Sequence, residues 1–287
     1  MEFTYLQAVI IGSIQGITEL FPISSLGHAI LIPAWIGGSF KDFVENQNDS
    51  YLLISIAMHL ASSLALFLVF RKRWIKILSG SFTALKSRQY DNTQFRVFGY
   101  IVIATVPVGA LGLAFEEYFA EIFGNPFYSS IFLSINGLIL IGAERLSRKT
   151  EKVVVLDSDQ EIDARINSKS ALVIGFGQSL ALFAGISRFG VSMSAGLIQK
   201  LNHSVASDFA FLLSLPVILG ASVIKLPELF TTSAQDLIGQ IFVGSFVSFC
   251  FTYISVTFLV RWFKTRTLYP FALYCLAVGC ISILRFS

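Results

Sequence analysis

The chain has 287 residues, of which 54% are hydrophobic and only 14% are charged, and its mean hydropathy is +0.71. Soluble domains carry about 25% charged residues, so this composition excludes a soluble domain and indicates an integral membrane protein. The formal net charge is +3, and no nucleic-acid partner is expected. The three cysteines lie in apolar runs without metal-ligand spacing, so we expect them to pack rather than to form disulfides or bind zinc.

The first apolar segment is interrupted at membrane depth. It reads QGITELFPISSLGH from Gln15 to His28, and so gathers five polar side chains within fourteen residues, namely Gln15, Glu19, Ser24, Ser25 and His28. Pro22 removes a backbone donor and ends a helix, so an irregular turn should follow it. Non-helical backbone at this depth requires a protein-enclosed or watery cavity. We therefore predict that residues 6–36 form a re-entrant helix, a turn and a second short helix.

Six further runs are long and apolar enough to span a bilayer and predict transmembrane helices. They cover residues 51–70, about 97–115, 127–143, 209–225, 237–260 and 267–284. The segment 171–199 differs from them, because its apolar stretch breaks at the polar sequence Ile186-Ser187-Arg188-Phe189-Gly190. We predict a second re-entrant segment here.

The two interrupted segments resemble each other. A shift of 163 residues aligns 8–28 with 171–191 and gives seven identities in twenty-one positions, among them Gln15/Gln178 and Ser24/Ser187. Such self-similarity indicates an internal repeat, which takes priority over local features. Each repeat then consists of one re-entrant segment followed by three spans.

The placement of Lys and Arg predicts the orientation of the chain. The loops 71–96 and 144–169 hold seven and six of these residues, whereas 37–50 holds one and 116–126 holds none. By the positive-inside rule the two basic loops are cytoplasmic, and threading the spans alternately puts both termini outside. The first re-entrant segment then enters from the outer face and the second enters from the cytoplasmic face.

The predicted fold is an all-α integral membrane protein with six transmembrane helices and two re-entrant helix-turn-helix segments in an inverted-topology repeat. It is a single membrane domain over residues 1–287, with repeat one at about 1–148 and repeat two at about 149–287. The broken helices of such repeats meet near the middle of the membrane, so we expect the functional site there.

Two motifs resemble those of a known family. The run QGITELFPISSLGH is similar to the [E/Q]-x-x-x-E and PxSSxGH signature of the undecaprenyl-diphosphate phosphatase family, the bacitracin-resistance type of membrane phosphatase. GISRFG resembles that family's second motif, PGxSRSGxT, and the resemblance extends over essentially the whole chain. It implies an enzyme of the bacterial inner membrane whose active site opens to the outer, periplasmic side.

The resemblance also implies a reaction and a partner. The enzyme would remove the terminal phosphate from a C55 isoprenyl diphosphate lipid, regenerating the carrier for peptidoglycan and other cell-wall synthesis. The family's functional residues fall on Gln15, Glu19, Ser25, His28 and Arg188. The chain departs from the family pattern at Leu26, Ala184, Phe189 and Ser192, where the family usually has Thr, Pro, Ser and Thr. Whether it forms a homodimer stays open.

The chemistry of these side chains suits phosphoryl transfer, which needs a nucleophile, donors for the phosphate oxygens and positive charge. Ser25 and His28 lie close enough for a nucleophile and base pair, or for His28 to attack directly. Arg188 offers a planar fork for phosphate. Glu19 could orient His28 or, with Gln15, bind a divalent cation, Mg²⁺ or Ca²⁺.

Further substrate contacts are expected around the two breaks. Backbone N–H groups at the starts of two short helices would bind phosphate, as helix N-termini do. The predicted substrate contacts are Gln15, Ser24, Gly27, Ser187, Gly190 and Ser192. His59 lies alone on an apolar span, so we expect a packing role for it.

Two other functions stay open on the sequence. Inverted repeats with broken helices are also the plan of secondary transporters, so the chain could be a polyprenyl-phosphate transporter or flippase. A lipid phosphotransferase that uses the diphosphate lipid as donor would need the same residues. A carrier needs no nucleophile, so the pair Ser25 and His28 beside Arg188 favours catalysis.

Overall fold

The computed structural model describes residues 3–38, 40–41, 49–115, 124–147, 158–225, 227 and 237–287, and all regular structure in these residues is helical. Six helices are long and apolar enough to cross a membrane, which confirms the six predicted spans. They are α4 (Asp49–Ser87), α5 (Thr93–Ala114), α7 (Pro126–Ser147), α11 (His203–Lys225), α13 (Ile238–Trp262) and α14 (Tyr269–Phe286). The chain is therefore an all-α, multi-span membrane protein.

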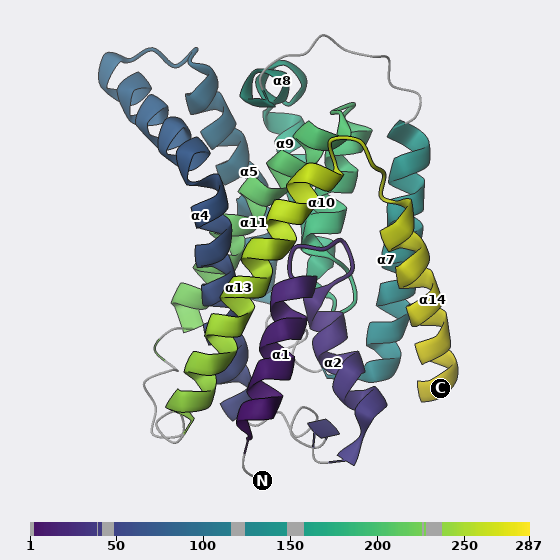
Figure 1. Ribbon diagram of the computed structural model, residues 1–287. Coiled ribbons are helices and arrows are strands. Elements are labelled where there is room, and N and C mark those ends of the chain that lie inside the picture. Colours follow the sequence, from purple (N-terminus) through teal and green to yellow (C-terminus); the bar gives the residue numbers. More distant parts are fainter. Residues whose placement is uncertain are drawn as a thin grey trace.

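The basic segments are more helical than predicted. The prediction of a loop over residues 71–96 is wrong for most of its length, because α4 continues to Ser87 and α5 begins at Thr93. This continuation projects from the bundle at the upper left of Figure 1. Charged residues end a membrane span but are good helix formers, so a helix can continue beyond the bilayer. In the second basic segment a short helix, α8 (Ser158–Arg165), follows residues 148–157, which lie outside the described part.

Two shorter helical hairpins complete the fold. The first consists of α1 (Tyr5–Thr18) and α2 (Ser25–Ile36), and the second of α9 (Ser168–Ser179), the 3₁₀ turn η1 (Leu180–Leu182) and α10 (Arg188–Ile198). The predicted helix, turn and helix pattern is confirmed in both segments. Their entry from opposite faces of a membrane, and so the inverted repeat, stays a prediction.

The hairpins pack on equivalent helices of the opposite half. In Figure 1, α1 and α2 lie in the lower half of the bundle, whereas α9 and α10 lie in the upper half. Gly12 of α1 lies against the backbone of Gly244 in α13, and Gly175 of α9 lies against Ala104 in α5, with no room for a Cβ at either glycine. Gly12 and Gly175 are related by the 163-residue shift, and α5 and α13 are each the second span of a half. This exchange of partners supports the internal repeat.

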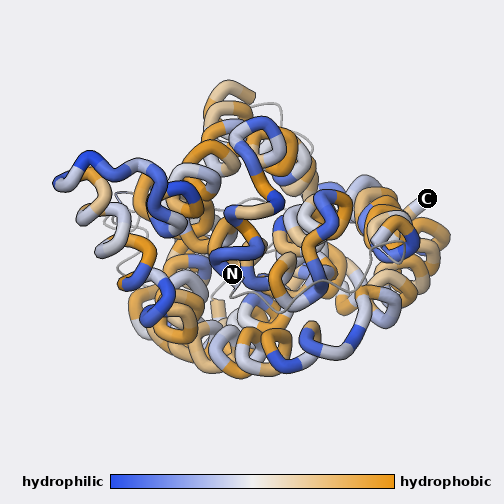
Figure 2. Tube along the Cα trace, turned by 90° about the horizontal axis from the view of Figure 1, so that it is seen from above, coloured by the Kyte–Doolittle hydropathy of each residue, from blue (hydrophilic) through white to orange (hydrophobic). Residues whose placement is uncertain are grey.

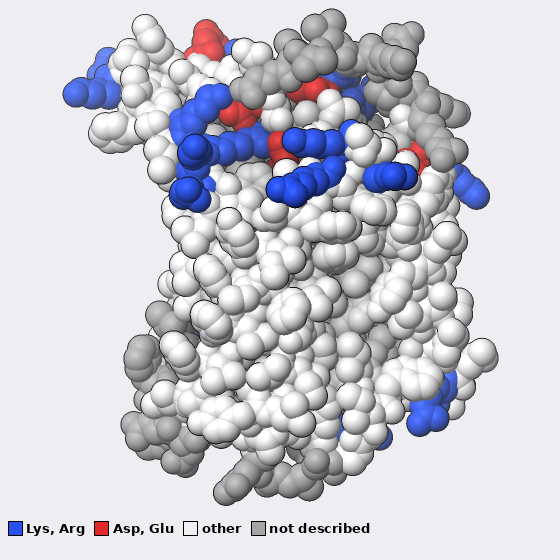
Figure 3. Space-filling view, viewed as in Figure 1, with Lys and Arg blue, Asp and Glu red and all other residues white. Residues whose placement is uncertain are grey.

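Charge divides the molecule into two ends. Lys and Arg gather at the upper end of Figure 3, above a broad uncharged band, and Figure 2 shows hydrophilic residues at this end of the bundle. Both termini lie at the opposite end (Figure 1). The predicted orientation agrees with this distribution, since the basic end would face the cytoplasm. The loops with few Lys and Arg, 37–50 and 116–126, lie mostly outside the described residues.

Carboxylates at the basic end form hydrogen bonds and ion pairs with cationic side chains of neighbouring helices. Arg73 of α4 donates from Nε to Asp159 Oδ1 in α8 and from Nη1 to Asp208 Oδ2 in α11, both at 2.8 Å. Glu144 of α7 lies 2.9 Å from His203 Nε2. Asp159 and Glu144 are each only 1% exposed, so these are buried pairs whose disruption would leave an uncompensated charge.

We expect the basic end to be cytoplasmic. A single cysteine introduced by Gln89→Cys into a chain without other cysteines should resist a membrane-impermeant thiol reagent in sealed right-side-out vesicles, and Ser287→Cys should react. Both positions are exposed, so protection reports the side of the membrane rather than burial. Permeabilised vesicles provide the control, since both cysteines must react there. The opposite labelling pattern would reverse the orientation.

Candidate active site

The turns of the two hairpins meet at the centre of the bundle. Ser24 Oγ accepts a hydrogen bond from the Gly185 N–H at 3.2 Å, and Ser187 Oγ donates to the Phe21 carbonyl at 3.1 Å. A Cβ on Gly27 would lie 2.9 Å from Gly185 Cα, so only glycine permits this approach of the two backbones. The predicted meeting of the two breaks is therefore present in the structure.

Asn136 of α7 bridges the two turns. This fully buried side chain donates from Nδ2 to the Pro22 carbonyl at 2.9 Å and accepts from the Ser187 N–H at 3.0 Å. Asn136 thereby gives a hydrogen-bond partner to one backbone group of each turn, the Pro22 carbonyl and the Ser187 N–H. Leaving such groups unpaired in an apolar interior costs about 1–3 kcal/mol each.

Repeat-equivalent serines cap the second helix of each hairpin. Ser24 Oγ accepts from the Gly27 N–H at 3.2 Å, and Ser187 Oγ accepts from the Gly190 N–H at 3.0 Å. In the structure the N–H groups of Gly27 and Gly190 donate to these caps, and their predicted contact with phosphate stays a prediction. The dipoles of α2 and α10 still direct their positive ends toward the turns, which favours an anion there.

Ser24 holds a strained backbone. Its φ is 71°, a left-handed value that costs a residue with a side chain about 1–3 kcal/mol. Its carbonyl accepts from His28 Nδ1 at 2.7 Å, and its hydroxyl is fixed by Gly27 and Gly185. The surrounding bonds therefore fix the residue that precedes Ser25.

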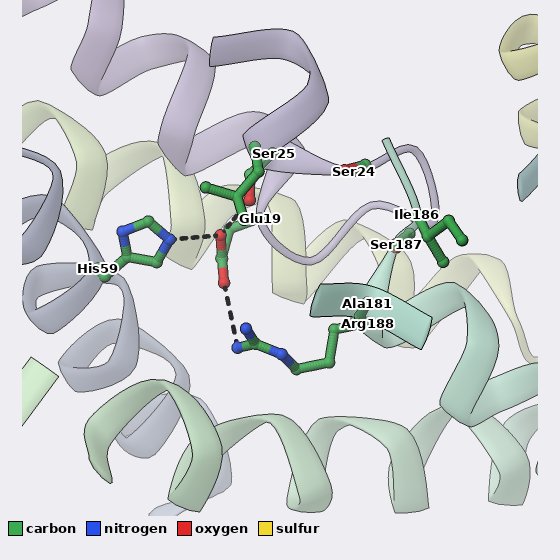
Figure 4. A pocket seen from close by; sticks show the side chains of 9 residues that line it. Glu19, Ser24, Ser25, His59, Ala181, Ile186, Ser187 and Arg188 are labelled. Atoms are coloured by element: carbon green, nitrogen blue, oxygen red, sulfur yellow. Dashed lines mark hydrogen bonds and ion pairs between the residues drawn. The ribbon is translucent and has the colours of Figure 1, made fainter. Parts of the chain in front are cut away.

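A small cavity lies where the turns face α4 (Figure 4), and its volume is about 20 Å³, enough for roughly one water molecule. Its lining comes from both hairpins and from α4. The residues are Glu19, Ser24, Ser25, Leu26, His59, Ala181, Ile186, Ser187 and Arg188. Five of the residues predicted from the sequence therefore line the cavity, namely Glu19, Ser24, Ser25, Ser187 and Arg188.

Glu19 is the centre of this cavity. Ser25 Oγ donates to Glu19 Oε2 at 2.5 Å, and Gln15 Nε2 donates to the same oxygen at 2.7 Å. Glu19 Oε1 lies 4.0 Å from Arg188 Nη1. Glu19 is 7% exposed, so its charge depends on these partners rather than on water. A hydroxyl that donates to a buried carboxylate is a recognised arrangement for an activated nucleophile.

Arg188 has hydrogen-bond donors that no described protein group accepts. Its Nε and Nη1 atoms are buried, and among the described residues neither has a hydrogen-bond partner. Buried guanidinium N–H groups without acceptors are costly, which indicates that a ligand supplies the acceptors. Figure 4 shows the guanidinium and Ser25 on the two sides of Glu19. Both residues line the same small cavity, so a phosphate in that cavity could meet both of them.

His59 is a cavity residue that the sequence analysis assigned to packing. Its Nδ1 lies 2.7 Å from the Ser55 carbonyl, so Nδ1 carries the hydrogen and Nε2 faces Glu19 Oε2 at 3.4 Å. The signal was available in the sequence, because an ionisable residue inside a membrane span is by default a functional candidate. What the sequence could not show is that α4 brings His59 beside Glu19.

His28 lies elsewhere, and the predicted pairs of His28 with Ser25 and with Glu19 are not present. His28 Nδ1 bonds to the Ser24 carbonyl, and Nε2 lies 2.8 Å from the Tyr274 hydroxyl in α14. Positions three apart on a helix lie only about 60° from each other, so the spacing allowed a pair with Ser25. The His28 ring instead stacks on Tyr274 of α14 and faces away from the cavity. Both ring nitrogens are thus engaged outside the cavity.

The remaining predicted contacts also lie outside the cavity. Gln15 reaches the site only through Glu19. Ser192 is fully buried, and its hydroxyl faces Gln178 Oε1 at 3.4 Å. For a divalent cation the described residues offer one carboxylate, Glu19, and no cluster of three His, Cys, Asp or Glu residues. This donor set does not form a resident cation cage, but it fits a cation that arrives with a diphosphate and takes Glu19 as its protein ligand.

Comparison with known proteins points to one family. The family model described as "Bacitracin resistance protein BacA" matches residues 8–281. The "Undecaprenyl-diphosphatase 2" of Frankia alni is 38% identical over 340 residues, which cover 100% of this chain and 99% of the relative. The undecaprenyl-diphosphatases of Mycolicibacterium paratuberculosis and Mycobacterium avium are 40% and 39% identical over 296 residues, with 98% of this chain and 97% of each relative covered.

We expect Asn136→Leu to lower stability by about 1–3 kcal/mol and to reduce activity, because it leaves the Ser187 N–H unpaired and the Pro22 carbonyl with only the weak thiol donor of Cys275. Ser134→Ala on the same helix is the matched control, since that hydroxyl only donates to the carbonyl of Ser130. Unfolding in detergent, followed by helical circular dichroism, measures the difference. Equal stability of the two variants would show that Asn136 does not hold the turns together.

Proposed function

The chain belongs to the bacitracin resistance protein BacA family, and we propose on that basis that it is an undecaprenyl-diphosphatase, a membrane hydrolase that releases the terminal phosphate of undecaprenyl diphosphate. The products are undecaprenyl phosphate and inorganic phosphate. The substrate proposed is the C55 isoprenyl diphosphate lipid, and the product would serve again as a carrier in cell-wall and glycan synthesis. The relatives at 38–40% identity over nearly the whole chain support this reaction.

One observation carries the proposal at the level of residues. A serine hydroxyl donates to a buried carboxylate, and an arginine with two unpartnered N–H groups lies on the other side of that carboxylate. Phosphoryl transfer requires these three elements, a nucleophile, a base and a cationic clamp on the phosphate oxygens. We therefore assign Ser25 as nucleophile, Glu19 as base and Arg188 as clamp.

In the first step Ser25 Oγ attacks the terminal phosphorus and its proton passes to Glu19. The bond from that phosphorus to the bridging oxygen breaks, and the lipid monophosphate leaves with the bonding electrons. Arg188 binds the equatorial oxygens through a planar fork, and the N-termini of α2 and α10 add positive potential. His59 Nε2 lies 3.4 Å from Glu19 Oε2 on the α4 side of the carboxylate.

In the second step water attacks the phosphoserine. The bond to Ser25 Oγ breaks, and this oxygen takes back the proton from Glu19. One proton of the water stays on the departing phosphate and the other is released. A phosphate group is larger than the present cavity, so the substrate must displace side chains, and Arg188 has few bonds to lose.

A divalent cation remains part of the proposal. Mg²⁺ or Ca²⁺ would arrive with the diphosphate and use Glu19 as its protein ligand, with Gln15 positioning that carboxylate. When bound, such a cation would neutralise charge on the diphosphate oxygens. Gln15 provides an amide at a position where a second carboxylate would raise the affinity of the site for a divalent cation.

We propose the bacterial inner membrane as the location, with access to the site from the outer, periplasmic side. The positive-inside rule assigns the basic end, where Arg73 pairs with Asp159 and His203 lies beside Glu144, to the cytoplasm. Access from the opposite, outer side is what the family resemblance implies. The transporter and phosphotransferase alternatives have no support among the relatives, whose names specify a diphosphatase.

The purified protein should release inorganic phosphate from C55 isoprenyl diphosphate. We expect Ser25→Ala to lower kcat by about a thousandfold or more and Glu19→Gln to lower it by about 10²–10⁴-fold. With substrate labelled in its terminal phosphate, the wild type should form a covalent phosphoprotein that Ser25→Ala cannot form. The same assay with chelator tests the cation. Absence of phosphate release by the folded wild-type protein would disprove the proposed function.

We also expect Arg188→Lys to recover little of the activity lost in Arg188→Ala. An ammonium cannot reproduce the bidentate fork, and loss of such a contact in a dry site costs about 2–4 kcal/mol of transition-state stabilisation. Arg261→Lys, at the exposed basic end of α13, is the matched control and should keep wild-type kcat/KM. Full activity of Arg188→Lys would remove the clamp assignment.

A further inference from the structure

The helix α4 is much longer than a membrane span needs. Its 39 residues extend about 58 Å at about 1.5 Å per residue, whereas the hydrocarbon core of a bilayer is about 30 Å thick. The apolar run of α4 ends at Phe70, and Arg71, Lys72 and Arg73 follow it. Residues 71–87 therefore form a helical segment beyond the hydrocarbon core, which we call the α4 extension.

The α4 extension leaves the bundle sideways. It slants away from the neighbouring helices at the upper left of Figure 1, and in the view from the basic end it reaches beyond the outline of the bundle on the left (Figure 2). In a membrane the bundle is surrounded by lipid. Lipid headgroups, rather than protein, therefore lie next to a part that projects sideways from the end of a span. The outer surface of the α4 extension is placed at the membrane–water interface.

One face of the α4 extension is fixed to the bundle. Ile77 and Ala84 are buried, with 0% and 2% exposure. Ser81 Oγ donates to the Gln94 carbonyl, at the start of α5, at 3.2 Å. A Cβ on Gly80 would lie 2.8 Å from Gln94 Cβ, so the two helices are in close contact. Because this face is held, the residues on the outer side are presented in fixed positions.

The outer side carries an apolar stripe. Its members follow one another at intervals of three and four residues, so they lie along one face of the helix. They are Ile75, Leu78, Phe82 and Leu85, and their exposed fractions are 61%, 47%, 70% and 55%. Four large apolar side chains in water are unfavourable, and insertion into the acyl region of a lipid leaflet removes them from water.

Cationic side chains border this apolar stripe. At about 100° per residue the stripe covers an arc of about 80°, and Lys72 and Lys86 project from the arc beside it. Arg71 lies at the membrane end of the stripe and Arg88 lies beyond its far end, and all four cations are exposed. The segment 71–90 contains no Asp or Glu. An apolar stripe beside cations is typical of helices that lie on anionic membrane surfaces.

We propose that the α4 extension binds anionic lipids of the leaflet at the basic end, which the positive-inside rule assigns to the cytoplasm. The apolar stripe inserts among the acyl chains, and the bordering cations bind the headgroup phosphates. Charge complementarity favours a lipid of net negative charge over a zwitterionic one. The contact is separate from the phosphate cavity and does not depend on the reaction proposed for it.

Quenching by labelled lipids tests the contact. Leu78→Cys, in the full-length chain without other cysteines, carries a nitrobenzoxadiazole fluorophore in vesicles of phosphatidylcholine with about one third phosphatidylglycerol. A nitroxide quencher is placed on the acyl chain of one lipid or the other, at equal mole fraction. We expect nitroxide-phosphatidylglycerol to quench about twice as strongly as nitroxide-phosphatidylcholine, because the cations enrich the anionic lipid around the helix.

Thr83→Cys is the matched control. Thr83 is exposed on the same helix but lies about 120° around it from the middle of the stripe. Its fluorophore should therefore be quenched less than half as strongly as that at Leu78 by either lipid. No quenching at Leu78 would overturn the proposal, because water or a second copy of the chain would then cover the stripe. Equal quenching at the two positions would also overturn it.

Neutral substitutions separate an anionic contact from burial in lipid alone. Lys72→Gln, Lys86→Gln and Arg88→Gln together should abolish the preference for nitroxide-phosphatidylglycerol at Leu78 and leave quenching by nitroxide-phosphatidylcholine in place. The matched control replaces the three cations of residues 261–266, exposed at the same end of the bundle, and should keep the preference. Equal quenching by the two lipids before substitution, or a preference that survives the three substitutions, would overturn the proposal.

Discussion

The structure depends on one constraint, which is that backbone broken at the centre of an apolar bundle must find hydrogen-bond partners within the protein. Bilayer and apolar core offer none, so each unpaired group would be costly. The two turns meet this constraint together, through Ser24 with Gly185, Ser187 with Phe21, and Asn136 between them. The contacts that satisfy the backbone are the same contacts that bring the two halves of the site together.

Buried charges are subject to the same constraint, because they too need partners within the protein. Glu19 is buried where an isolated carboxylate would be strongly disfavoured, and it persists because Ser25, Gln15, His59 and Arg188 surround it. Arg188 pairs with Glu19 at 4.0 Å, but two of its nitrogen atoms have no hydrogen-bond acceptor among the described residues. The free site is thus short of negative oxygen atoms, which a phosphate would supply. Stability and substrate preference follow from one arrangement of charge.

The two halves share their helix-capping serines but differ in the residue that follows each cap. Ser24 and Ser187 are equivalent positions and both cap a helix, as the repeat requires. The next positions differ, with Ser25 in the first half and Arg188 in the second. In the proposed mechanism the first hairpin provides the nucleophile and the second provides the phosphate clamp, and both side chains line one cavity. Glu19 belongs to the first half alone, since its repeat-equivalent position is Leu182.

The sequence by itself determined the spans, the two breaks and the basic end, because these depend on hydropathy, proline and charge, which act locally along the chain. It also singled out Glu19, Ser25 and Arg188 as candidates, since polar residues inside apolar sequence are rarely incidental. Only the tertiary structure decided which of these residues meet. It placed His59 of α4 beside Glu19 and His28 beside Tyr274, some 246 positions away in the sequence. Residue spacing fixes neighbours on one helix, whereas the packing of separate helices fixes which side chain faces which space.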